Sequence, residues 1–156
     1  NLLSRIKKAG IVPVPNPGFF NENAEIYVKY YGDRVNWMFP LRSYLDNGIT
    51  AALGSDSPVI EADPMIGLYG ALTRADKCSG IVAGKDQRIG IMDAIRMYTY
   101  NGAYASLEEK IKGSIEPGKL ADLVILSGNI LDTPVEELKS LKADMTVIDG
   151  QIVYKR

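Results

Sequence analysis

The 156-residue sequence contains no histidine, and this absence restricts the chemistry that these residues can perform by themselves. Ser-His-Asp and Cys-His nucleophile systems both use an imidazole as their base, so neither can form within this chain. Imidazole-ligated metal sites are excluded for the same reason. The single cysteine, Cys78, excludes an internal disulfide, a cysteine zinc site and an iron–sulfur cluster. One unpaired cysteine is typical of a reducing compartment and predicts a cytoplasmic location.

The sequence also lacks a long apolar run and an excess of basic residues. No segment approaches the ~18 consecutive apolar residues that a membrane span needs, so no membrane partner is expected. Eighteen basic and nineteen acidic residues give a net charge of −1. This balance predicts no nucleic-acid partner, because no positive excess is present to neutralise phosphates. The content of 46% hydrophobic and 24% charged residues is that of a globular protein.

The first 110 residues alternate short apolar runs with helical patterns. Residues 11–14 and 49–53 are predicted to form buried strands, each of which leads into a loop. The clearest amphipathic helix is predicted over residues 91–100, with Asn101-Gly102 as its end. Strands that alternate with helices indicate parallel β/α units and an α/β fold.

Three capping signals predict where other helices begin. Asp63-Pro64 offers a carboxylate cap followed by proline in the first helical position. Asn21 is predicted to cap a helix that ends near residue 32, and Ser106-x-x-Glu109 has the spacing of a capping box.

After residue 112 the pattern changes to short strands joined by turns. Leu123–Leu126 is predicted as a strand, and Asp149-Gly150 predicts a type I′ turn between two further strands. We therefore divide the chain into residues 1–111, which carry the β/α units, and residues 112–156, which form part of a small sheet domain.

The sharpest candidate site is Gly54-Ser55-Asp56, directly after the second apolar run. It places a carboxylate at the carboxyl end of a predicted strand, where open α/β sheets and barrels carry their active sites. Gly54 would allow another group to approach the backbone closely. The structural alternative is that Asp56 or Ser57 caps a helix that begins at Pro58.

Other motifs carry weaker signals. Residues 113–119 have the spacing of a phosphate-binding loop, but Leu120 stands where a magnesium-binding Ser or Thr is required and Pro117 removes a backbone N–H. We therefore reject a phosphate-binding loop here. A nucleotide-binding domain stays a third possibility, which rests only on this failed match and which the absence of a thermal shift with ATP and magnesium would exclude. Cys78, which follows Lys77, is interpreted as a passive thiol because no base is available to it. Three arginines are interpreted as solvated or ion-paired structural residues: Arg34, Arg42 and Arg74.

Five segments carry a resemblance that extends over most of the chain. They are GITAALGSDSPV (48–59), DPMIGLYGALTR (63–74), residues 94–109, KGSIEPGKLADLVIL (112–126) and TVIDGQIVY (146–154). In this order they resemble metal-dependent amidohydrolases, and GSDSPV followed by the DP-initiated helix is similar to the branch called amidohydrolase family 3, or YtcJ-like.

The resemblance implies a (β/α)8 (TIM) barrel with one or two divalent metals, usually zinc, and a small β-sandwich assembled from both ends of a longer chain. Residues 11–14 and 49–53 would correspond to the seventh and eighth strands. This chain would then supply the last two β/α units of the barrel and part of the composite sandwich. The start at Asn1 and the lack of histidine agree with a carboxyl-terminal fragment that follows the metal-binding histidines of the family.

The resemblance gives Asp56 two roles, as a metal ligand and as the catalytic group. It would accept a proton from a metal-activated water and deliver it to the leaving nitrogen. The implied reaction is hydrolysis of a non-peptide C–N bond in a small amide, formamide or cyclic amide by the full-length protein, which is expected to form a homodimer. The isolated chain is expected to be inactive and to bind no metal. The alternative is a non-catalytic interaction module that exposes its sheet edges.

Overall fold

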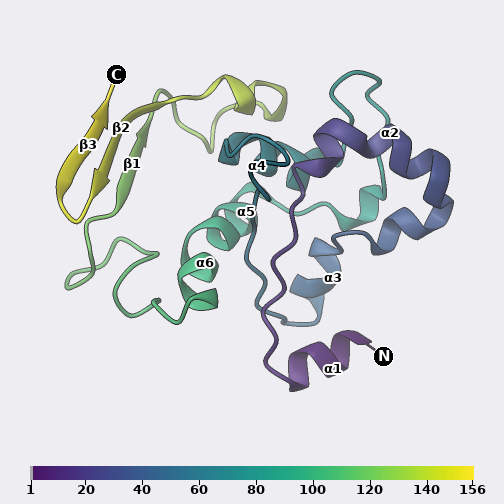
Figure 1. Cartoon of the computed structure of the whole chain (residues 1–156), viewed down its shortest axis with the longest axis horizontal. Helices are drawn as coiled ribbons and strands as arrows, with labels where there is room; N and C mark the ends of the chain where they lie inside the picture. The colour runs from purple at the N-terminus through teal and green to yellow at the C-terminus, as the bar shows by residue number, and fades with distance from the viewer. Residues whose placement is uncertain (1) are drawn as a thin grey trace.

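Two extended segments, residues 11–17 and 49–55, run side by side through the helical part of the chain (Figure 1). The computed structural model describes residues 2–156. The Ala52 N–H donates to the Pro13 carbonyl oxygen at 3.0 Å and the Gly54 N–H donates to the Pro15 carbonyl oxygen at 3.1 Å, so the two segments are parallel.

The prediction of regular strands at 11–14 and 49–53 is wrong, because both segments are extended without strand pairing. A parallel ladder needs N–H groups that donate in both directions between its strands. Here the donors of the first segment would be residues 15 and 17, and both are proline. Only the second segment therefore donates to the first.

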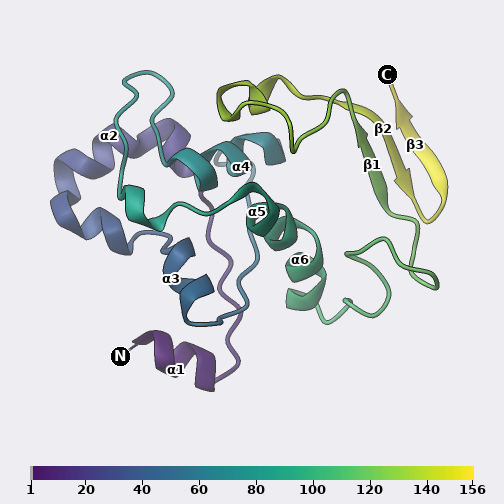
Figure 2. The same ribbon diagram turned by 180° about the vertical axis from the view of Figure 1, so that it is seen from behind.

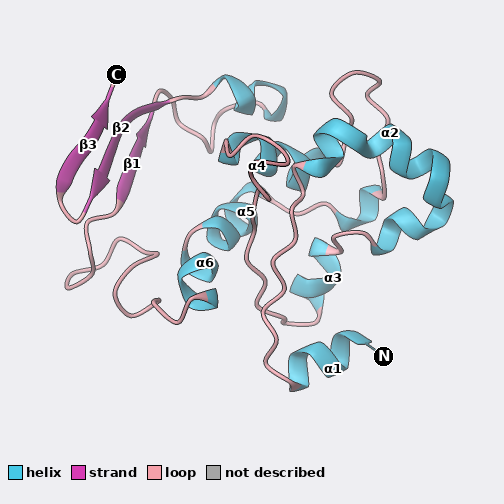
Figure 3. Cartoon of the chain, in the orientation of Figure 1, coloured by secondary structure: helices cyan, strands magenta, loops and turns pink. Residues whose placement is uncertain are grey.

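Helices precede, separate and follow the extended segments (Figure 3). The α-helices are α1 (Leu2–Lys8), α2 (Phe19–Tyr31), α3 (Leu41–Asp46), α4 (Pro64–Thr73), α5 (Ile91–Tyr98) and α6 (Tyr100–Ala105). The 3-10 helices are η1 (Gly32–Trp37), η2 (Lys85–Gln87) and η3 (Val135–Ser140). Within residues 2–156, none of these helices has the length and apolarity to cross a membrane.

The capping predictions have different outcomes. Asp63 caps α4 as predicted, and its carboxylate accepts the Met65 N–H at 2.9 Å. Asn21 does not cap a helix, because α2 begins two residues earlier and encloses it. The Ser106 capping box is also wrong, since Ser106 follows the last residue of α6 and its hydroxyl donates back to the Ala103 carbonyl at 3.1 Å.

The helix predicted over residues 91–100 is divided in the structure. Helix α5 ends at Tyr98, and α6 begins at Tyr100 after a break at Thr99. Asn101 does not end a helix; it is buried, and its side-chain amide donates to the Ala51 carbonyl at 2.8 Å. This hydrogen bond fixes the second extended segment against α6.

The main core lies between the extended segments, α4, α5 and η3. Its buried residues are Leu41, Ala51, Leu53, Met65, Leu68, Ala71, Ile89, Ala94, Met97, Leu138 and Leu141. Leu138 and Leu141 come from the carboxyl-terminal third, so residues after 112 contribute to the same core as α4 and α5. The division at residues 111 and 112 stays a prediction.

A three-stranded antiparallel sheet lies at one end of the molecule (Figure 2). It comprises β1 (Leu123–Leu126), β2 (Ala143–Ile148) and β3 (Gln151–Lys155) in sequential order. Asp149 and Gly150 both have positive φ, 49° and 76°, which confirms the predicted type I′ turn. The chain is thus α/β with a small sheet, and its assignment to two barrel units stays a prediction.

Candidate functional site

Asp56 follows the second extended segment and lies exposed in the left-handed backbone conformation, with φ of 64°. Its carboxylate has no hydrogen-bond or ion-pair partner within residues 2–156. The Asp56 carbonyl oxygen accepts the Val59 N–H at 2.9 Å, which closes a turn. No helix begins at Pro58, so Asp56 and Ser57 do not cap one and the carboxylate is left free for another role.

Asn16 lies at the matching end of the first extended segment, and no motif in the sequence marked it as a site residue. A Cβ atom at Gly54 would lie 2.7 Å from Asn16 Oδ1, so the Asn16 side chain occupies the space that glycine leaves open. Asn16 thus joins the site through Gly54, two residues before Asp56. Its position just after a predicted strand was the only signal in the sequence.

Tyr98 of α5 supports the same segment. Its hydroxyl donates to the Gly54 carbonyl at 3.4 Å. A Cβ at Gly67 of α4 would lie 1.8 Å from the hydroxyl oxygen, so this glycine makes room for the ring. Burial, with a smaller contribution from Asp63, raises the pKa of Tyr98 to about 12. Tyr98 is therefore a neutral hydrogen-bond donor across the physiological pH range.

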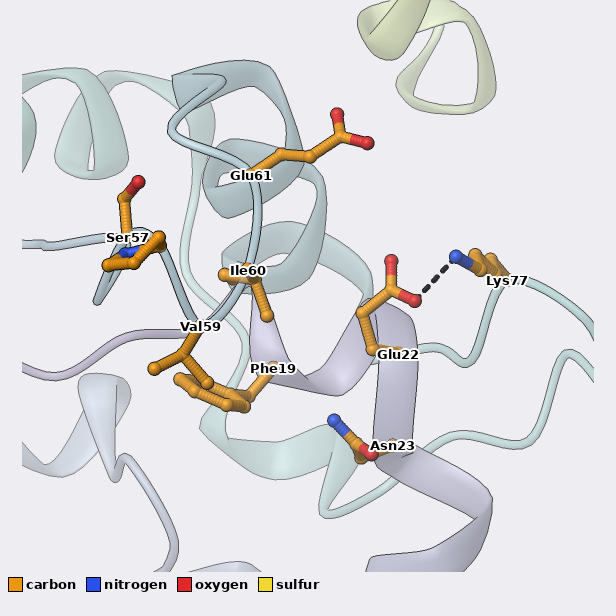
Figure 4. A pocket seen from close by; sticks show the side chains of 9 residues that line it. Phe19, Glu22, Asn23, Ser57, Val59, Ile60, Glu61 and Lys77 are labelled. Carbon is orange, nitrogen blue, oxygen red and sulfur yellow. Dashed lines mark hydrogen bonds and ion pairs between the residues drawn. The ribbon is translucent and has the colours of Figure 1, made fainter.

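A cavity of about 750 Å³ opens beside the Asp56 turn (Figure 4). It lies between the start of α2, the loop after Asp56 and the loop after α4. The lining side chains of interest are Phe19, Glu22, Val59, Ile60, Glu61 and Lys77. Apolar and charged groups therefore face the same space.

An ion pair between Glu22 and Lys77 closes one side of this cavity, and the dashed line in Figure 4 marks it. The two residues are 55 positions apart, so the pair connects α2 to the loop after α4. The hydrogen bond that Lys77 donates to the Glu22 carboxylate is the main cause that raises the pKa of Lys77. The Asn21 side-chain amide donates to the other Glu22 carboxylate oxygen at 2.9 Å and holds it in place.

The interpretation of Arg74 as a solvated or ion-paired residue is wrong, because its side chain is fully buried. The guanidinium donates to four backbone carbonyls, those of Val35, Met38, Phe39 and Ala83. Desolvation, with a smaller contribution from Arg88, lowers the pKa of Arg74 to about 10, so it remains charged at neutral pH. Arg74 joins the loop after α4 to the segment that follows α2.

Arg42 and Arg34 agree with their interpretation as ion-paired or solvated residues. Arg42 Nε lies 2.8 Å from Asp46 Oδ1 within α3, and both side chains are about half exposed. Arg34 is exposed. Neither residue lines the cavity beside Asp56.

The described residues do not form a metal centre by themselves. Within residues 2–156, no group of three or more His, Cys, Asp or Glu side chains is placed to hold a metal ion. Stable zinc sites take three or four protein ligands, and Asp56 would supply one. Any metal bound by Asp56 would need ligands from outside this chain.

A family model described as the amidohydrolase family matches residues 1–154, and the chain belongs to this family. The sequence is 34% identical over 154 residues to an N-substituted formamide deformylase from Arthrobacter pascens. This match covers 97% of this chain and 28% of the deformylase. It is 32% identical over 126 residues to YtcJ from Bacillus subtilis, covering 80% of this chain and 24% of YtcJ. The chain thus spans about a quarter of these relatives.

Solved structures agree with this family assignment. An uncharacterized metal-dependent hydrolase from Pyrococcus horikoshii superimposes with a TM-score of 0.74 and 29% identity, covering 86% of this chain and 28% of that protein. Guanine deaminase from E. coli superimposes with a TM-score of 0.66 over 99% of this chain and 36% of the deaminase. At 16% identity the second match shows a shared fold alone.

Proposed function

We propose that this chain acts as the carboxyl-terminal part of a longer metal-dependent amidohydrolase that cleaves a non-peptide C–N bond. The substrate would be a small amide, formamide or cyclic amide. The deformylase from Arthrobacter pascens, which is named for N-substituted formamides, supports this choice of bond. Residues 11–14 and 49–53 would correspond to the seventh and eighth strands of the barrel and would pair with strands outside this chain.

The observation that carries the proposal is the free carboxylate of Asp56 at the carboxyl end of an extended segment. An exposed acid in a left-handed turn, without a partner within residues 2–156, has no evident structural task. A carboxylate in this position is suited to take a proton from an attacking water and to return it to the departing nitrogen. Asn16 and Tyr98, which contact Gly54, would fix the turn that presents it.

A divalent metal, zinc by family resemblance, would supply a more acidic water and polarise the substrate carbonyl. Asp56 would be one of its ligands, and the remaining ligands would come from outside this chain. In the proton transfer described above, the Asp56 carboxylate itself accepts and returns the proton.

The test is an activity screen of the full-length protein against formamides, cyclic amides and N-acyl amines, combined with metal analysis. We expect release of an amine or a carboxylic acid from at least one class, and loss of this activity when the metal is removed by a chelator. Absence of turnover on every class by the metal-loaded protein would contradict the proposal.

A further inference from the structure

The function proposed above gives no role to the cavity beside Asp56. Its volume, about 750 Å³, lies within the range of about 300–1,000 Å³ that is typical of small-molecule sites. Figure 4 shows Phe19, Val59 and Ile60 on one side of it and the Glu22–Lys77 pair on the other. The cavity therefore has an apolar wall and a charged wall.

The apolar wall is joined directly to Asp56. The Val59 N–H donates to the Asp56 carbonyl oxygen at 2.9 Å. The first and fourth Cα atoms of such a turn lie within about 7 Å of each other. Because Asp56 is proposed to return a proton to the leaving nitrogen, the group attached to that nitrogen would lie near Val59, which lines the cavity.

One side chain of this wall is packed against α2, and another remains open to solvent. A Cβ at Gly18 would lie 2.8 Å from Ile60 Cδ1, so Ile60 packs against the backbone at the start of α2. Val59 is 66% exposed. Apolar surface of this kind gains free energy when an apolar group covers it.

The charged wall carries a net negative charge. Lys77 is neutralised by Glu22. The exposed Glu61 carboxylate has no hydrogen-bond or ion-pair partner within residues 2–156. The Glu61 carboxylate also acts on Lys77, because its charge contributes to the raised pKa of Lys77. Two carboxylates and one ammonium group leave a net charge of −1, which repels an anionic ligand and attracts a cationic one.

We propose that this cavity binds the substituent on the leaving nitrogen of the substrate and selects substituents with an apolar body and an uncharged or cationic end. Phe19, Val59 and Ile60 contact the body, and Glu61 faces its end. This inference rests on the proposed function, which places the leaving nitrogen next to Asp56 because Asp56 returns a proton to it.

Three formamides of nearly equal length test the charge selection in the full-length protein. They are the formamides of butylamine, of 1,4-diaminobutane and of 4-aminobutyrate, whose far ends are a methyl, an ammonium and a carboxylate group. We expect kcat/KM for the carboxylate compound to be at least about 10-fold below that for the ammonium compound. Equal values, or a preference for the carboxylate, would overturn the inference.

Two variants connect this preference to the cavity. Glu61→Lys should reverse the preference, and Glu136→Lys, which makes the same change of charge at an exposed position in η3, should leave it unchanged. Phe19→Leu should lower the ratio of kcat/KM between the butyl compound and N-methylformamide several-fold. If Glu136→Lys changes the preference as strongly as Glu61→Lys does, the effect comes from the overall charge of the protein, and the inference is overturned.

Failure of the proposed function is distinguishable from failure of this inference. If none of the compounds is hydrolysed, the proposed function fails for formamides, and calorimetric binding of the same three compounds decides the role of the cavity. Tighter binding of the ammonium compound, lost in Glu61→Lys, supports it. Equal binding of all three, or a preference that Glu61→Lys does not alter, overturns it.

Discussion

The Arg74 guanidinium carbon lies 3.8 Å from the centre of the Phe20 ring, and both side chains are fully buried. The cation stacks on an aromatic face while its N–H groups donate to backbone carbonyls. Because Phe20 belongs to α2 and Arg74 follows α4, this contact fixes the two segments that flank the cavity. The start of α2, which carries Phe19 and Glu22, is positioned in the same way.

Replacing Arg74 by lysine should destabilise the protein by about 2–4 kcal/mol, because one ammonium cannot serve four carbonyls in a buried place. The measurement is urea denaturation of wild type and variant. Arg88→Lys is the matched control, since Arg88 is exposed and donates to a single carbonyl, that of Thr73. We expect less than about 0.5 kcal/mol for the control. Similar small losses at both positions would contradict the assigned role of Arg74.

Two glycines within helices should respond to alanine with opposite signs. A Cβ at Gly70 of α4 would lie 2.2 Å from the Pro17 carbonyl oxygen, so Gly70→Ala must separate α4 from the first extended segment at a cost of about 1–3 kcal/mol. A Cβ at Gly102 of α6 would meet no atom within 4 Å. Gly102→Ala should therefore stabilise the protein by about 0.5–1 kcal/mol. Thermal denaturation of both variants decides this, and destabilisation by Gly102→Ala would be the contrary result.

Tyr98 should make stability depend on pH in the alkaline range. Its pKa is raised from 10 to about 12 in the folded protein, so between these values the folded state holds a proton that the unfolded state has lost. The contribution of Tyr98 is then fully present below pH 10 and is lost as the pH rises towards 12. Tyr98→Phe should remove this part of the decline, which is measured as the difference in unfolding free energy between wild type and variant. A difference that stays constant from pH 9 to pH 12 would refute the prediction.

Local signals in the sequence were sufficient for several elements. Asp63-Pro64 predicted the start of α4 correctly because the cap and the fixed φ of proline act within three residues. Asp149-Gly150 predicted the hairpin correctly, since a type I′ turn needs only two residues that tolerate positive φ. Asp56 was also found from a local signal, because the apolar run of residues 49–53 ends at the Gly54-Ser55-Asp56 motif.

Features that depend on distant contacts were missed. The burial of Arg74 depends on carbonyls 9 to 39 positions away, and no local pattern distinguishes it from a solvated arginine. The Glu22–Lys77 pair spans 55 positions. The extended segments lack regular pairing because of the prolines at 15 and 17, although their apolar pattern is that of strands.

The most direct test of the central claim is kcat of the full-length protein with Asp56→Asn, on the substrate found by the screen. Asp149→Asn is the matched control, because Asp149 is also exposed with positive φ but lies in the β2–β3 turn, away from α4 (Figure 2). Asparagine tolerates this backbone conformation, so both variants should fold. The account predicts that Asp56→Asn lowers kcat by at least about 100-fold and that Asp149→Asn leaves it unchanged. A kcat near that of wild type in Asp56→Asn would contradict the account.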